Sequence, residues 1–232
     1  DSGGTAASVT FTATGTATAA GTLFIRVGDR LVEVAIPSGT VNTDVGALIE
    51  AALDAVADLP VTTASSTNVA TVTCRHKGTI GNQIPFTINA LGQAGGEEFP
   101  AGISIAISAT HPVNGATDPT SSSWITGMGD DAYDVIVPSL TTSGMMGVLK
   151  TETARRWGPL VAVEGHAIAV VLDSATDLAA YVVARNDKHL TVFGAKESAG
   201  WLTPAYELAA SAAGVAALAL GNDPGAPLQG LQ

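Results

Sequence analysis

The chain has 232 residues, which fits one large domain or two small ones and is enough to bury a core without disulfides or metals. Its formal net charge is −11, with only 10 Lys and Arg, which argues against binding to nucleic acid or to an anionic membrane surface. Apolar residues make up 46% but aromatic residues only 5%, so we expect a core of small and β-branched side chains. The single cysteine, Cys74, excludes an internal disulfide framework and any cysteine-based zinc site, and is predicted to be a buried thiol in a strand.

The first half of the chain is predicted to be rich in β-structure. Gly28-Asp29 separates two β-branched runs and, as a two-residue loop with glycine first, indicates a β-hairpin. The predicted strands are Val9–Thr12, Thr22–Val27, Arg30–Ile36, Val61–Ala64, Val69–Arg75, Ile84–Leu91 and Ile103–Ala109. One helix interrupts them: apolar residues recur at helical spacing from Val45 to Val56, after the capping candidates Asn42, Thr43 and Asp44 and before Pro60.

The pattern changes in a stretch rich in Pro, Gly and Asn, from His111 to Pro119, which we interpret as a domain boundary. Beyond it, strands and helices alternate, which indicates a parallel sheet with right-handed crossovers. Ser174 and Asp177 resemble a capping box at the start of one of these helices. The predicted elements are strands Asp134–Pro138, His166–Leu172 and Leu190–Phe193, and helices Ser143–Trp157, from Ser174 onward, and Thr203–Leu220.

We therefore predict an α+β protein of two domains. Residues 1–112 are expected to form a β-rich, sandwich-like domain with one helix, and residues 113–232 an α/β domain with a mostly parallel sheet.

The last helix carries only one charge, Glu207, between its predicted cap Thr203 and Leu220. This pattern predicts a core helix covered on most sides, with the strand Asp134–Pro138 among its neighbours and with Gly214 at a close backbone approach. Because the chain ends in a Pro/Gly connector after this helix, we expect it to be a segment of a longer protein.

Ser139 or Ser174 could in principle form a hydrolase triad with His166 and Asp173. However, the chain has no Gly-x-Ser-x-Gly elbow, and His166 begins a predicted strand instead of following one. Ser174 is better explained as a helix cap. None of the predicted strand ends carries a glycine-rich phosphate-binding fingerprint before a helix.

The remaining polar groups also favour structural interpretations. His76, His111, His166 and His189 lack metal-ligand spacing. Asp130, Asp131 and Asp134 could hold a cation but are expected to be acids of a surface turn. The only basic, glycine-bearing loop, Arg75–Asn82, could cradle an anion but is expected to be a shaped turn. The sequence thus predicts no catalytic, cofactor-binding or metal site, and no cofactor.

Three stretches taken together resemble one family, the contractile-tail sheath proteins of Mu-like bacteriophages and prophages. The first is His76–Asn82, after a strand. The second is Gly129–Pro138, with Arg156–Pro159 and Gly165–Ala167 downstream. The third is the Ala-rich helix leading into Asn222-Asp223-Pro224 and Pro227-Leu228-Gln229. Gly225-Ala226 departs from the expected bulkier or basic pair.

The resemblance implies a structural virion protein and not an enzyme. Proteins of this family polymerise as rings around a tail tube, contract to drive the tube through the host envelope, and take part in genome ejection. They are linked by terminal arms that add strands to neighbouring sheets. The implied partners are other sheath subunits in a helical homo-oligomer, the tail tube protein, the baseplate and the tail terminator, with assembly in the host bacterial cytoplasm. The resemblance implies neither nucleic-acid binding nor membrane insertion. Without the arms, this segment is expected to be monomeric.

Two other functions are compatible with the residues alone. The β-rich half could be a surface- or glycan-binding module of a phage or cell-surface protein, although all three tryptophans lie in the second half. The other alternative is an α/β enzyme, but the sequence has no recognisable nucleophile or cofactor-binding loop.

Overall fold

The structure, a computed structural model, describes residues 3–118, 121–196 and 203–222. The described residues form a mixed α+β protein, as predicted, and divide into two compact units. In the described part, unit 1 comprises residues 3–118 and 203, and unit 2 comprises residues 121–196 and 204–222. Each unit is treated by itself below.

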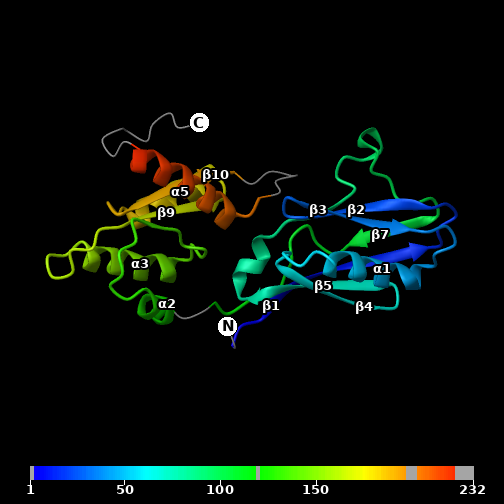
Figure 1. Ribbon diagram of the computed structural model, residues 1–232, viewed down its shortest axis with the longest axis horizontal. Helices are drawn as coiled ribbons and strands as arrows, with labels where there is room; N and C mark the ends of the chain where they lie inside the picture. The colour runs from blue at the N-terminus through cyan, green and yellow to red at the C-terminus, as the bar shows by residue number, and fades with distance from the viewer. Residues whose placement is uncertain (1–2, 119–120, 197–202, 223–232) are drawn as a thin grey trace. The chain divides into compact units, whose positions relative to one another are not determined.

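Unit 1 contains two antiparallel sheets and one α-helix (Figure 1). The four-stranded sheet has the order β4-β5-β1-β7, and the three-stranded sheet has the order β3-β2-β6. The strands are β1 (Ala6–Gly15), β2 (Gly21–Val27), β3 (Arg30–Ile36), β4 (Val61–Ser66), β5 (Val69–Lys77), β6 (Phe86–Ile88) and β7 (Ile103–Ile107), and the helices are α1 (Asn42–Asp54) and the short 3-10 turns η1 (Thr79–Gln83) and η2 (Gln93–Gly95).

The two sheets of unit 1 share one core. Alternate residues of β1 point inward, and the ring of Phe11 meets that of Phe86 from the other sheet edge to face, with ring centres 6.1 Å apart. Cys74 belongs to this core, as predicted, and burial raises its thiol pKa to about 11. The predicted hairpin is confirmed: Val27 pairs with Arg30 across Gly28-Asp29, with Gly28 at φ +62°.

The helix α1 packs against the four-stranded sheet and against β3. Gly46 permits this approach, because a Cβ there would lie 3.1 Å from the carbonyl oxygen of Thr67. The predicted side-chain cap was wrong. Val41 is the N-cap residue, and no side chain makes a capping hydrogen bond, since Asn42 already lies in the first helical turn. The predicted strand Ile84–Leu91 is shorter than expected, because only Phe86–Ile88 pair with β2.

Unit 2 is built on a three-stranded parallel sheet of order β10-β9-β8, in agreement with the predicted parallel arrangement. Its strands are β8 (Val135–Ile136), β9 (His166–Leu172) and β10 (Leu190–Ala195), and its helices are α2 (Ser121–Met128), α3 (Ser143–Arg156), α4 (Ala175–Arg185) and α5 (Ala205–Asn222). Only two residues of the predicted strand Asp134–Pro138 pair with β9, so β8 is a short edge strand.

The central strand β9 separates two layers of helices (Figure 1). Ala167 and Ala169 pack with Met146 and Leu149 of α3 on one side. Ile168 and Val170 pack with alanines of α5 on the other side. The alternation follows from the two-residue period of a strand, and burial on both faces explains why β9 is almost entirely apolar.

The helix α5 contacts β9 and β8 as predicted, but the prediction that it is covered on most sides was wrong. Its buried residues form one narrow stripe of alanines, at positions 205, 209, 213 and 216. The opposite face is in solvent, with Leu218 68% exposed. The single charge of this helix predicted a helix without an exposed face. Its contact with the sheet comes mainly from the alanine stripe, with Leu208 and Ala212 packed beside it.

The predicted close backbone approach at Gly214 was wrong. Gly214 lies on the exposed side of α5, with nothing within 4 Å of the position that a Cβ would take. We therefore expect Gly214→Ala to stabilise unit 2 by about 1 kcal/mol, because the glycine has only its backbone entropy cost and no packing role. Thermal unfolding followed by circular dichroism measures this change. A destabilised variant would show that a close backbone contact exists at Gly214 after all.

A buried ion pair fixes the long loop between β6 and β7. Glu97 accepts hydrogen bonds from the guanidinium of Arg26 on β2 and, at 2.9 Å, from the backbone N–H of Leu91. The Arg26 guanidinium, together with the Leu91 amide, lowers the pKa of Glu97 from 4.5 to about 2 despite its burial.

This depressed pKa predicts an acid-sensitive loop. A carboxyl whose folded pKa lies below its unfolded value stabilises the fold above pH 4.5, and loses that contribution as the pH falls toward about 2. Glu97→Gln cannot titrate, so the stability difference between the parent and this variant should shrink across the same interval. Urea unfolding at a series of pH values measures it. A difference that is independent of pH would contradict the ion pair.

Candidate functional site

The residues of the hypothetical triad are not assembled. His166 begins β9, whereas Asp173 and Ser174 follow its other end, about 20 Å away for a strand of this length. The His166 imidazole makes a 2.8 Å hydrogen bond with the hydroxyl of Thr191 instead. Ser174 caps α4, since its hydroxyl accepts from the backbone N–H of Asp177, and this confirms the predicted capping interaction. Ser139 is exposed.

The basic loop Arg75–Asn82 is occupied by a carboxylate of the chain itself. Asp118 accepts hydrogen bonds from the backbone N–H and the hydroxyl of Thr79, at 2.6 and 2.8 Å. Asn82 exchanges two 3.0 Å hydrogen bonds with the backbone of Gly115. The loop is thus a shaped turn, as predicted, and it holds the end of the boundary stretch His111–Asp118 against unit 1.

Two of the candidate metal residues make other interactions. Asp130 forms a 2.8 Å ion pair with Arg155. His189 is buried, and its ring lies against that of Trp157 with centres 4.8 Å apart. Within the described ranges, no group of three or more His, Cys, Asp or Glu side chains is arranged to hold a metal ion. In the same ranges, no helix is both long and apolar enough to cross a membrane.

Parts of the second family-like stretch meet in unit 2 around a buried arginine. Arg156, at the end of α3, is 1% exposed. Its Nε donates to Glu152 at 2.9 Å, and its terminal nitrogens donate to the carbonyl oxygens of Gly129 and Asp131 at 2.7 and 2.8 Å. The guanidinium also lies 5.6 Å from the centre of the Tyr133 ring. One side chain therefore ties the loop before β8 to the end of α3.

Glu152 is the acidic partner in this network. It accepts from both Arg155 and Arg156, and these guanidinium groups, Arg155 first, lower its pKa despite the opposing effect of burial. The sequence indicated the spacing of Glu152 and Arg156 but not the two backbone carbonyls that complete the arginine's coordination.

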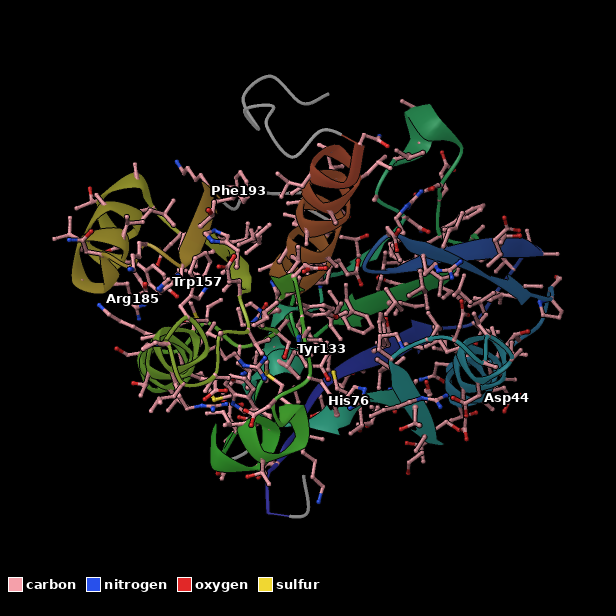
Figure 2. All side chains as sticks on the ribbon, turned by 60° about the vertical axis from the view of Figure 1, so that its left-hand side comes forward. Asp44, His76, Tyr133, Trp157, Arg185 and Phe193 are labelled. Atoms are coloured by element: carbon pink, nitrogen blue, oxygen red, sulfur yellow. The ribbon has the colours of Figure 1, made fainter. Side chains whose placement is uncertain are left out.

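The next residue, Trp157, is fixed in the same way. Its indole N–H donates to the carbonyl oxygen of Gly165 at 2.8 Å, and the amide of His166 donates to the carbonyl of Asp134 at 2.9 Å. Gly165 is required here, because a Cβ would lie 2.4 Å from the carbonyl oxygen of Tyr133. These bonds align the starts of β8 and β9. Figure 2 shows where the Trp157 side chain lies in unit 2.

A surface pocket of about 500 Å³ opens at this place, and we call it the Trp157 pocket. It lies at the starting end of the parallel strands. Its lining comes from the starts of β8 and β9, from the end of α3 and from the end of α5: Asp134, Val135, Trp157, Glu164, Gly165, His166, Ala217, Leu220 and Gly221. Sequence reasoning missed it, since we searched for ligand sites at the opposite ends of the strands, where open α/β sheets usually bind them.

The charged side chains that line the Trp157 pocket are all acidic. Asp134 and Glu164 are both exposed, and Lys and Arg are absent from its lining. Burial and, secondarily, the neighbouring His189 lower the pKa of His166 below 6.5, against the opposing effect of Asp187. His166 is therefore neutral at neutral pH, and the pocket carries net negative charge.

Comparison with known proteins supports the resemblance inferred from these stretches. No family model matches the chain. The chain is 31% identical, over 218 residues, to the Mu-like prophage FluMu tail sheath protein of Haemophilus influenzae. This chain is related to a phage tail sheath protein.

The relationship to the sheath protein extends over 94% of this chain but only 43% of the relative, so the chain spans less than half of its relative's length. The matched region is long enough to include most of both structural units. The predicted resemblance to Mu-like tail sheath proteins is thus confirmed, and what the whole sheath protein does enters below as a proposal.

Proposed function

We propose that this chain is part of a structural subunit of a phage contractile tail sheath, which polymerises around the tail tube and contracts to drive it through the host envelope. The observation that carries the proposal is the 31% identity to a tail sheath protein along 94% of the chain. On this proposal the protein is not an enzyme. The separation of His166 from Asp173 and Ser174 is consistent with that, because these groups serve structural hydrogen bonds.

The fold of unit 2 offers two places where neighbouring strands could be added. β8 and β10 are the edge strands of the parallel sheet, and in the described part of the chain neither has a partner on its outer side. Unpaired edges are templates for strand addition from another chain. We propose that terminal arms of neighbouring subunits add here, with residues 113–232 forming the core domain of the sheath and residues 1–112 a removable peripheral domain.

Unit 2 also exposes apolar side chains that a monomer would be expected to cover. Leu160 is 99% exposed and Val183 78% exposed, and Leu218 lies on the open face of α5. Exposed apolar groups of this kind are typical of surfaces that are covered in an assembly. In this proposal other sheath subunits cover some of them, with the tail tube protein, baseplate and tail terminator as further partners, within a virion assembled in the host cytoplasm.

Electron microscopy of the full-length protein in negative stain tests the proposal. Helical tubes of regular diameter are the expected result, and the 232-residue chain alone should sediment as a monomer. A full-length protein that stays dispersed and binds glycans would instead favour the alternative, a surface-binding module centred on the β-rich unit 1.

A further inference from the structure

The Trp157 pocket combines features that a cationic side chain requires. The indole of Trp157 is 43% exposed, although tryptophan is the largest apolar side chain. It is fixed by its hydrogen bond to the carbonyl of Gly165 and by contact with the ring of His189. Because His189 lies against the ring, the indole is held in one orientation at the pocket wall. A rigid, partly exposed indole is the preferred aromatic surface for a cation.

The charges around the indole favour the same occupant. Asp134 and Glu164 line the pocket from two different loops, and no ion pair to either carboxylate is found in the described part of the chain. The carboxylates of Asp130 and Glu152 are already paired with Arg155 and Arg156. Two carboxylates beside an indole therefore remain without a cation, in a pocket that holds none of its own.

Part of the remaining pocket wall is apolar. Val135, Ala217 and Leu220, from β8 and α5, line the same pocket as the two carboxylates. Long basic side chains bury an aliphatic stem on such surfaces and keep the charged group beside acids. Arginine fits best, because its planar guanidinium stacks on an indole and donates to two carboxylates at once.

We propose that the Trp157 pocket is a binding site for an arginine side chain presented by a partner protein, with Trp157 as the stacking surface and with Asp134 and Glu164 as the paired acceptors. The inference rests on the geometry and charge of the pocket and does not depend on the sheath assignment.

A pair of peptides that differ in one functional group tests this site. The 232-residue chain, labelled with ¹⁵N, is titrated with an acetylated, amidated Gly-Gly-Arg-Gly-Gly peptide, and the indole N–H resonances are followed by NMR. The control peptide carries citrulline, which has nearly the shape of arginine but no charge. Trp157→Phe identifies the Trp157 resonance by its loss. We expect the arginine peptide to shift this resonance in a saturable way and the citrulline peptide to bind roughly tenfold more weakly or not at all.

Matched variants separate the pocket from general attraction to an acidic protein. Asp134→Asn with Glu164→Gln keeps the shape of both side chains and should weaken the arginine peptide roughly tenfold. Glu33→Gln with Asp131→Asn removes the same charge from exposed acids outside the pocket lining and should leave binding unchanged. Equal shifts by both peptides, or equal weakening by both double variants, would overturn the proposal. The dispersion of the other indole and amide resonances reports whether each variant is folded.

Discussion

Replacing Arg156 with methionine is expected to lower the free energy of unfolding of unit 2 by about 3–5 kcal/mol. The side chain is 1% exposed and donates to Glu152 and to the carbonyl oxygens of Gly129 and Asp131. Methionine fills much of the same space but leaves both carbonyls without their donor and removes one cation from a buried carboxylate. Urea unfolding followed by tryptophan fluorescence measures the effect, since Trp124 and Trp157 both lie in unit 2.

The neighbouring arginine is the matched control. Arg155 pairs with the same glutamate and with Asp130, but its side chain is 42% exposed. Solvent screens such a pair, so Arg155→Met should cost only about 0–1 kcal/mol. Equal losses for the two variants would contradict the central position that the structure gives to Arg156.

Replacing Phe11 with alanine is expected to cost unit 1 about 3–5 kcal/mol. Phe11 is fully buried in β1 and contacts Phe86 of the opposite sheet, so its removal leaves a cavity between the two sheets. Circular dichroism of the β-rich transition measures the change. Thr14→Ala, on the same strand but exposed, should stay within about 0.5 kcal/mol of the parent.

The two variants together test the proposed division into domains. If the units fold independently, Arg156→Met lowers only the transition seen by tryptophan fluorescence, and Phe11→Ala lowers only the transition of the β-rich unit. A single transition that both variants shift equally would mean that residues 1–112 are not a removable domain.

Local signals in the sequence predicted the elements whose formation depends on neighbouring residues. The Gly28-Asp29 hairpin follows from a turn that needs a positive φ, and the start of α4 follows from the Ser174 hydroxyl and the Asp177 amide three residues later. The alternation of strands and helices after residue 120 likewise predicted the parallel sheet. Each of these depends on interactions within a few residues or on a repeating pattern.

Features that depend on distant residues could not be read in this way. The carboxylate that fills the basic loop belongs to Asp118, 39 positions after Thr79. The exposed face of α5 depends on how much of the sheet lies beneath it, which a sequence with a single charge does not reveal. The Trp157 pocket joins residues from the beginning of β8 to the end of α5, and the signal that could have found it was the adjacency of Trp157 to the family-like Arg156.

The double-sided packing of β9 restricts how this chain can change in length. Small alanines face α3 and larger Ile and Val side chains face α5, so the two faces of β9 differ in side-chain volume. Deleting one residue within it would exchange the two sets, placing branched side chains where only methyl groups fit and leaving voids opposite. The loop from Trp157 to Gly165 ends just before β9, in which every residue must keep its face. Insertions and deletions among related sequences should therefore accumulate in that loop and be absent from His166 onward.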